Sequence, residues 1–464
     1  MNGESMVLSR YSKVFQCREE PESLILFSTK ETSVVRISKS VIRDIERDNL
    51  TEDEKKTLRR LGFLVKSRGD EKNEMRSFTN KLNATRRDLS ATVVMNLDCN
   101  LACTYCFQGR RKGKYYMSKE TADTFIEFVK KTIISSDPAP LSSEGRGKGK
   151  KPSERGGRNI DEISLTFYGG EPLLSYKLII YISKQLKQLA EENGITYSFS
   201  LITNGTLLTE SVVRQMKPLG LISAKITLDG PKAVHDLSRP FVSGLGSFDV
   251  IARNLKAATN MMEIQIGGNY TTDNYADFPL LLDVMIESGL GPDRISVVKF
   301  DPVMNESPEF APPHFHSGCM SVNEPWLWEA GLFLREEILR RGYQTPRFIS
   351  TVCMIEQTDN LVINYDGSIF KCPGLIGRRN FCAGDLQTGL QDFRQSHHLG
   401  NYRNDECLEC SYLPLCFGGC RYMKVIRDGN MEGVDCKKPF FDATLEAFVL
   451  QDITYSGQLS PSRA

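Results

Sequence analysis

The segment Asn96-Leu-Asp-Cys-Asn-Leu-Ala-Cys-Thr-Tyr-Cys-Phe107 follows directly on the apolar run Ala91-Thr-Val-Val-Met95. It places three cysteines, Cys99, Cys103 and Cys106, within eight residues, with gaps of three and two residues between them. Three thiolates at this spacing can hold three irons of a cubane iron–sulfur cluster and leave its fourth iron without a protein ligand. Structural zinc sites usually take four ligands, often as two C-x2-C pairs. The run therefore predicts a cluster with one iron open for chemistry.

The whole chain has the composition of an ordinary soluble protein. Its 464 residues are enough for two or three domains, and its net charge of +1 gives no global bias toward nucleic acid or anionic membrane. No apolar run approaches the length of a membrane span, and the N-terminus lacks the apolar core of a signal peptide. Thirteen cysteines in a large intracellular chain indicate metal or redox cofactors rather than disulfides. We therefore predict a cytoplasmic protein with neither a membrane nor a nucleic acid as its partner.

Residues 1–85 are predicted to form a small, separate α+β domain. The segment Glu22–Ile37 has the pattern of two short strands joined by a polar turn, and Phe63–Val65 is expected to add a third strand. Helical patterns lie at Lys39–Arg47 and Thr51–Leu61. Such a domain is either a plain stabilising cap or a module that binds an extended peptide as an added strand.

Residues 90–305 alternate apolar, strand-like runs with amphipathic segments of helix length, which predicts parallel βαβ units and a partial (β/α)6 TIM-like barrel. Catalytic residues of such folds lie at the carboxyl ends of the strands, where the cysteine run also falls. Residues 137–158 are rich in Gly, Ser, Pro and basic residues, and we expect a disordered, solvated insertion there. The strand candidates are Ala91–Met95, Ile163–Phe167, Tyr197–Ile202, Ser223–Leu228, Ile264–Tyr270 and Ile295–Val298.

Polar turns follow several of these strands. Tyr168-Gly-Gly-Glu-Pro172 comes after the second strand, and its glycines allow a tight turn and close approach to a ligand. Glu171 adds a carboxylate there that suits a cationic ligand group. His235 is interpreted as a residue that satisfies a loop backbone. The turns after the third and fourth strands are Thr203-Asn204-Gly205 and Asp229-Gly230-Pro231. The fifth-strand stretch Gln265-Ile-Gly-Gly-Asn-Tyr-Thr271 brings Gly and Asn to the same rim.

Cysteines return after the barrel. Val362–Cys372 has the pattern of a hairpin with an Asp-Gly turn, which presents Cys372 near Cys353. C-x2-C spacing suits zinc as well as iron, so a pair of zinc sites is the alternative to clusters. The cysteines of this region are Cys353, Cys372, Cys382, Cys407, Cys410, Cys416, Cys420 and Cys436.

The cysteine run, with Gly-Gly-Glu-Pro and Thr-Asn-Gly in register after it, resembles the radical S-adenosylmethionine (radical SAM) superfamily, and the later spacing resembles the SPASM domain. The resemblance spans about residues 90–440. It implies a connecting helical segment at 306–345, a SPASM domain at 350–445 and a tail at 446–464. It also implies S-adenosylmethionine and three [4Fe–4S] clusters, the first of them on Cys99, Cys103 and Cys106. The residues that it implies near the cofactor are Tyr105, Gly169, Gly170, Glu171, Asn204 and Asn269, with Asp229 on the substrate or acid–base side.

For the auxiliary clusters the same resemblance implies two ligand sets. The inner set lacks an obvious fourth ligand, for which Cys382, Cys319 or a substrate thiolate are the candidates. The outer set is Cys407, Cys410, Cys416 and Cys436, and the inner set is Cys353, Cys372 and Cys420.

The reaction implied is hydrogen abstraction by a 5′-deoxyadenosyl radical, and SPASM-bearing members usually act on peptides. The leading interpretation is a maturase of a ribosomally made precursor peptide, resembling geopeptide and thioether-forming maturases, with the leader bound by residues 1–85. A flavodoxin or ferredoxin would be the electron donor. The alternative is an anaerobic sulfatase-maturating enzyme, in which an Asp usually follows the second SPASM cysteine, whereas Pro373 follows Cys372 here. A zinc-bearing scaffold that binds nucleic acid and an electron carrier are further alternatives.

Overall fold

A computed structural model describes residues 6–17, 19–134, 160–306, 311 and 318–455. The predicted insertion at 137–158 lies outside the described residues. Among the helices that are described, none is both long and apolar enough to cross a membrane.

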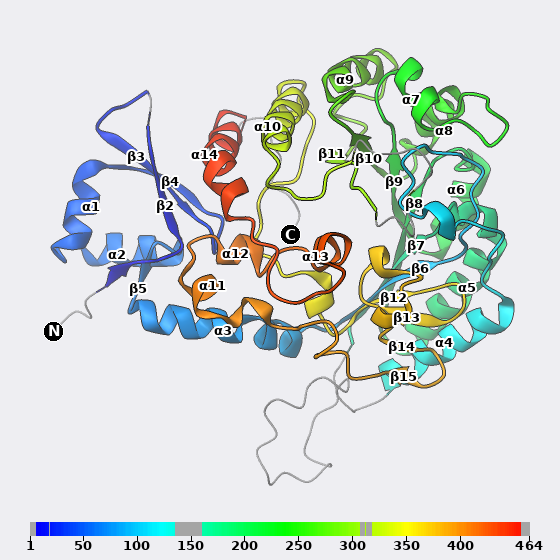
Figure 1. The fold of residues 1–464 in the computed structure, drawn as a ribbon, viewed down its shortest axis with the longest axis horizontal. Helices are drawn as coiled ribbons and strands as arrows, with labels where there is room; N and C mark the ends of the chain where they lie inside the picture. Colours follow the sequence, from blue (N-terminus) through cyan, green and yellow to red (C-terminus); the bar gives the residue numbers. More distant parts are fainter. Residues whose placement is uncertain (1–5, 18, 135–159, 307–310, 312–317, 456–464) are drawn as a thin grey trace, which may run out of the picture.

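The middle of the chain forms a parallel sheet in which sequential strands are neighbours (Figure 1). Every neighbouring pair from β6 to β11 is parallel. This order confirms the predicted partial barrel, and each strand overlaps its predicted range. The strands are β6 (Asp88–Val94), β7 (Glu162–Tyr168), β8 (Thr196–Thr203), β9 (Leu221–Thr227), β10 (Glu263–Tyr270) and β11 (Val297–Pro302).

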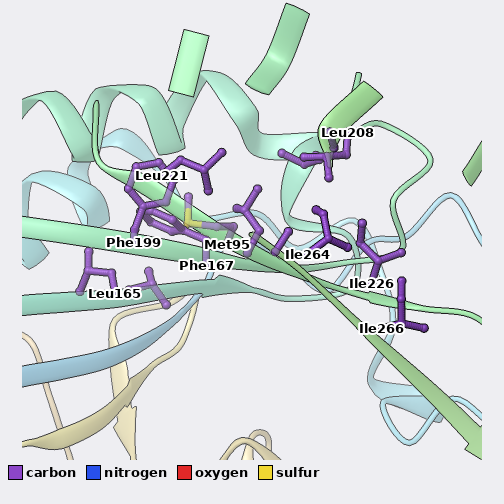
Figure 2. Close-up of a cluster of buried hydrophobic side chains, with 14 of the residues drawn as sticks. Met95, Leu165, Phe167, Phe199, Leu208, Leu221, Ile226, Ile264 and Ile266 are labelled. Carbon is purple, nitrogen blue, oxygen red and sulfur yellow. The ribbon is translucent and has the colours of Figure 1, made fainter. Parts of the chain in front are cut away.

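Helices cover the outer side of this sheet (Figure 1). Figure 2 shows the apolar side chains that fill the layer between them, and Phe167 and Phe199 meet edge to face on neighbouring strands with ring centroids 5.3 Å apart. Full burial of one such side chain stabilises the fold by about 1.5–3 kcal/mol. The helices are α4 (Lys119–Ile134), α5 (Tyr176–Glu192), α6 (Glu210–Met216), α7 (Lys232–Ser238), α8 (Phe248–Ala258) and α9 (Phe278–Glu287).

The N-terminal residues form an antiparallel sheet of β2 (Ser12–Gln16), β3 (Ser23–Ser28) and β4 (Val34–Ser38), with β4 at one edge. The sequence did not predict β2. The predicted strand at Phe63–Val65 exists as β5 (Leu64–Val65), but it pairs with β1 (Val7–Leu8) instead of the hairpin. Three helices follow the sheet, two of which were predicted: α1 (Lys39–Glu46), α2 (Glu52–Arg60) and α3 (Arg68–Thr85).

The N-terminal sheet is docked on the C-terminal region through β2 and the turn after β3. The Lys13 ammonium donates a hydrogen bond to Tyr412 Oη at 2.8 Å, and Thr29 Oγ1 donates to the backbone oxygen of Ser411 at 2.7 Å. This contact leaves β4 as the sheet edge remote from the docked strand.

The predicted hairpin is β12 (Asn360–Ile363) and β13 (Ser368–Phe370), and it is not a separate sheet. β12 pairs in parallel with β6, so the hairpin and the two short strands after it extend the barrel sheet to ten strands. The predicted boundary at residue 446 falls inside α14, because this helix runs on to Thr454. The remaining elements are β14 (Gly384–Asp385), β15 (Gly389–Leu390), α10 (Pro325–Arg340), α11 (Asp405–Glu409), α12 (Leu413–Cys416), α13 (Arg421–Asp428) and α14 (Lys438–Thr454).

Candidate functional site

The first three cysteines lie in the loop that leaves the carboxyl end of β6. Cys99, Cys103 and Cys106 are free thiols, all of them partly exposed. Burial raises the pKa of Cys103 to about 11, and the neighbouring thiols of Cys106 and Cys99 act in the same direction, so the three sulfurs are near one another. Within the described ranges, no three Cys, His, Asp or Glu side chains converge on a point that suits one metal ion.

The loop that follows β7 packs backbone to backbone against the start of the cysteine loop. The backbone N of Gly170 donates to the oxygen of Asn96 at 3.0 Å, and that of Glu171 donates to the oxygen of Asp98 at 2.8 Å. A Cβ atom would lie 2.4 Å from the Asn96 oxygen if placed on Gly169, and 2.1 Å from the Asp98 oxygen if placed on Gly170. Both positions therefore need glycine, because any side chain would push the cysteine loop away.

The carboxylate of Glu171 is fully buried and is used by the protein itself. It accepts hydrogen bonds from the backbone N of Leu173 at 2.9 Å, from Thr203 Oγ1 at 2.8 Å and from the backbone N of Asn204 at 2.8 Å. Burial raises the pKa of this carboxyl, although the three hydrogen bonds act in the opposite direction. The sequence predicted a carboxylate available to a cationic ligand. Three donors occupy most of its acceptor sites and tie the end of β7 to that of β8, and its predicted contact with a ligand stays a prediction.

Replacing Glu171 by Gln is expected to lower the free energy of unfolding by about 1–3 kcal/mol. An amide offers one oxygen where the carboxylate offered two, so at least one buried N–H loses its acceptor. Urea unfolding followed by circular dichroism measures the effect. Glu210→Gln is the matched control, since Glu210 is about half exposed and pairs with Arg214 on the surface of α6, and its loss should cost less than about 0.5 kcal/mol. Equal stability of the two variants would contradict the role of the Glu171 carboxylate in tying the end of β7 to that of β8.

Asn204 connects the end of β8 to the cysteine loop. Its Nδ2 donates to Asn100 Oδ1 at 2.8 Å and lies 3.8 Å from Cys99 Sγ, and its Oδ1 accepts from Thr206 Oγ1 at 2.7 Å. The side chain is therefore a neighbour of the first thiol. Its predicted contact with a cofactor stays a prediction.

Tyr105 joins the cysteine loop to the ends of β9 and β10 through a buried polar network. Its hydroxyl donates to Asp229 Oδ2 and accepts from Arg239 Nη1 at 2.7 Å. The backbone N of Asn269 donates to Asp229 Oδ1 at 2.7 Å, and its Nδ2 donates to the Tyr105 hydroxyl at 3.1 Å. Three of the predicted site residues thus lie in one hydrogen-bonded group, together with Arg239.

Asp229 is the buried carboxylate of this network, and its predicted acid–base role stays a prediction. The side chain has no exposed surface, and Arg239 Nη1 lies 3.8 Å from Asp229 Oδ2. Burial raises the pKa of Asp229, and the Arg239 charge opposes that rise. Asp229 therefore holds Arg239 and Tyr105 in place. Arg239 was not predicted as a site residue, because its partners are distant in the chain.

His235 is a structural residue, as interpreted from the sequence. It is completely buried, its Nδ1 accepts from the backbone N of Asp229 at 3.2 Å, and its Nε2 lies 3.0 Å from Ser247 Oγ. Burial lowers the pKa of His235 to about 3. The imidazole is therefore neutral and fixes the loop after β9.

The C-terminal cysteines gather in two groups. Burial raises the pKa of Cys372, and the thiols of Cys353 and Cys420 raise it further. In the other group, burial raises the pKa of Cys407. The neighbouring thiols of Cys416, Cys410 and Cys436 raise it further. These are the two predicted ligand sets, and their assignment to clusters stays a prediction.

Cys382 and Cys319 were the protein candidates for the fourth inner ligand. The Cys382 thiol donates to the backbone oxygen of Gly384 at 3.2 Å, and the residue packs against the same hydrophobic cluster as Cys353, Cys372 and Cys420. Cys319 is buried, and its backbone forms an isolated β-bridge with Met304. The fourth inner ligand stays a prediction.

Known proteins share this arrangement, although no protein-family model matches the chain. The serine-type anaerobic sulfatase-maturating enzyme of Klebsiella pneumoniae is 24% identical over 355 residues, which cover 69% of this chain and 78% of that enzyme. The radical SAM cyclopropyl synthase TigE of Paramaledivibacter caminithermalis is 21% identical over 379 residues, covering 77% and 72%. The chain is thus similar over most of its length to a radical SAM enzyme.

Solved structures share the fold of this chain. The anaerobic sulfatase-maturating enzyme anSMEcpe with bound AdoMet superimposes with a TM-score of 0.57 at 19% identity, covering 78% of this chain and 98% of that one. Streptococcus suis SuiB bound to its precursor peptide SuiA gives a TM-score of 0.51 at 15% identity, covering 94% and 98%. The SuiB likeness therefore takes in most of the chain, including its N-terminal region.

Proposed function

We propose that this enzyme uses S-adenosylmethionine and three [4Fe–4S] clusters to modify a ribosomally made precursor peptide. One observation carries the proposal: the loop of Cys99, Cys103 and Cys106 is fastened at the carboxyl ends of the barrel strands, by the backbone N of Glu171 on the Asp98 oxygen and by the Tyr105 hydroxyl on the buried Asp229 carboxylate. These strand ends are where barrel enzymes assemble their active sites. The three thiolates would hold the first cluster, and the two C-terminal groups would hold the auxiliary clusters.

When bound, the cofactor and the first cluster supply a 5′-deoxyadenosyl radical that removes a hydrogen atom from the substrate. The described residues hold the cysteine loop in place. The glycine turn at Gly169 and Gly170 allows the cysteine loop to approach β7 closely, and the hydroxyl of Tyr105 holds its proton toward Asp229 Oδ2. A flavodoxin- or ferredoxin-type protein would deliver the electron that starts each turnover.

The N-terminal sheet supports a peptide as substrate. Strand β4 pairs with β3 on one side, and along the described chain no strand pairs with its other side. A peptide leader can add a strand at such an edge, where backbone hydrogen bonds give affinity. The SuiB structure, which contains its precursor peptide, superimposes on 94% of this chain.

The product that we propose is a thioether between a peptide Cys sulfur and a peptide carbon. In this reaction the peptide keeps its sulfur and loses two hydrogen atoms. The cofactor radical takes one of them from the carbon. The other leaves as the thiol proton and one electron, and the auxiliary clusters accept that electron. The anSMEcpe complexes with Cys-containing peptides support formylglycine formation as the second candidate. In that reaction the Cys sulfur leaves the peptide.

Mass spectrometry of a treated peptide separates these products. Reconstituted enzyme, S-adenosylmethionine and dithionite are incubated anaerobically with a synthetic Cys-containing precursor peptide and, separately, with a Cys-containing sulfatase peptide. We expect the precursor to lose two hydrogens, retain its sulfur and resist alkylation by iodoacetamide. Conversion of the Cys of the sulfatase peptide to a sulfur-free aldehyde would instead support the second candidate function, formylglycine formation. An unchanged mass for both peptides, with no 5′-deoxyadenosine formed, would refute the proposed function.

A further inference from the structure

Arg421 is the largest fully buried side chain among the described residues, and it stands directly after the predicted cluster ligand Cys420. It is the first residue of α13, which lies beside the β12–β13 hairpin (Figure 1). Its Nη2 forms an ion pair with Glu356 Oε1, and the Glu356 carboxylate accepts the backbone N of Gly400 at 2.9 and 3.1 Å. The pair therefore lies wholly inside the protein.

Two N–H groups of this guanidinium have no partner. Along the part of the chain that the structure describes, Arg421 Nε and Nη1 are buried without a hydrogen-bond acceptor. Leaving buried donors of a charged group unpaired costs about 1–3 kcal/mol or more. The neighbouring buried cation differs, because the Lys371 ammonium donates to three backbone oxygens, those of Gln357, Thr358 and Asn360. The free donors of Arg421 therefore indicate an acceptor that belongs to the site.

The inner cysteine group is the place for that acceptor. Arg421 is bonded to Cys420, and its charge reaches the Cys353 thiol, where it lowers the pKa against the effect of burial. Glu356 lies three residues after Cys353 in the turn that begins at that cysteine. Arg421 and Glu356 thus place one positive and one negative charge beside the same group of thiols.

We propose that the unpaired N–H groups of Arg421 serve the inner auxiliary cluster of Cys353, Cys372 and Cys420, and that Arg421 raises its reduction potential while Glu356 lowers it. The proposal rests on the proposed function, which assigns a cluster to these thiolates. Hydrogen bonds to cluster sulfurs and nearby positive charge favour the reduced, more negative cluster. A raised potential makes the inner cluster a better acceptor for the electron that the substrate releases.

A redox titration followed by electron paramagnetic resonance tests this tuning role. It is done on the Cys99/Cys103/Cys106→Ala background, so that only the auxiliary clusters contribute. At a fixed solution potential, Arg421→Gln is expected to raise the oxidised-to-reduced ratio of one cluster about tenfold, which is about 59 mV for a one-electron couple. Glu356→Gln is expected to shift the same cluster in the opposite direction. Arg421→Lys keeps the positive charge but loses the planar set of guanidinium N–H donors. It should therefore shift the oxidised-to-reduced ratio less than Arg421→Gln.

Arg335→Gln is the matched control, because Arg335 forms a buried ion pair with Asp452 at 2.6 Å between α10 and α14 and should leave both potentials unchanged. Shifts of the same sign in the Arg421 and Glu356 variants, or no shift at full iron content, would overturn the proposal. If Arg421→Gln loses iron, the Glu356→Gln shift alone decides. A background protein without auxiliary iron and sulfide would instead refute the proposed function.

Discussion

Replacing Cys99, Cys103 and Cys106 together by alanine is expected to abolish the formation of 5′-deoxyadenosine from S-adenosylmethionine. These thiolates are the proposed protein ligands of the first cluster, and a cluster without ligands is not retained. After anaerobic reconstitution the wild type should contain about twelve irons per chain, and the triple variant about four fewer. Iron, sulfide and zinc analysis, together with chromatography of 5′-deoxyadenosine under dithionite, measures both effects.

Cys17→Ala is the control for this variant. Cys17 is a buried free thiol of the N-terminal sheet, where it packs with Ile25 and Tyr412 rather than with the barrel cysteines. Its removal should change neither the iron content nor the cleavage of S-adenosylmethionine. About two zincs per chain with negligible sulfide in the wild type would contradict the cluster assignment and leave a structural metal protein.

The barrel could be predicted from the sequence because its strands place buried apolar residues at alternate positions and are separated by segments of helix length. Ile163–Phe167 and Tyr197–Ile202 lie within β7 and β8. Strand β2 was missed because its exposed and half-buried residues give a weaker pattern. The parallel pairing of β12 with β6 was also missed, since it joins residues some 270 positions apart, Leu361 with Ala91.

The candidate site shows the same division. Local spacing identified the run of Cys99, Cys103 and Cys106, and the resemblance to the SPASM domain implied the two later cysteine sets. The roles of Glu171, Arg239 and Arg421 depend on what each side chain meets after folding, and the sequence holds no local signal for those partners. Glu171 was accordingly predicted to face a ligand, whereas its carboxylate accepts three hydrogen bonds from the protein.

Gly170→Ala is expected to reduce 5′-deoxyadenosine formation by about a hundredfold or more while leaving every cysteine in place. The added methyl carbon would lie 2.1 Å from the backbone oxygen and 2.6 Å from the backbone carbon of Asp98, distances that real Cβ atoms essentially never show. Asp98 must therefore move by about 1 Å, and Cys99 is bonded to it. A displacement of this size in a positioned group can cost about 10²-fold in rate. The same shift strains the hydrogen bond from the Glu171 backbone N to the Asp98 oxygen, 2.8 Å in the native loop.

Gly69→Ala separates this steric effect from the general effect of losing a glycine. Gly69 lies in the first turn of α3, and a Cβ there would meet only Ser67 Oγ at 3.7 Å, an ordinary contact. This variant should keep the wild-type rate and gain up to about 1 kcal/mol of stability, because alanine favours a helix over glycine. Iron analysis of Gly170→Ala then shows how the rate is lost. Retained iron with a slow reaction means that the cluster is held but misplaced against β7, whereas a wild-type rate would mean that the close packing of these two loops is not needed for the chemistry.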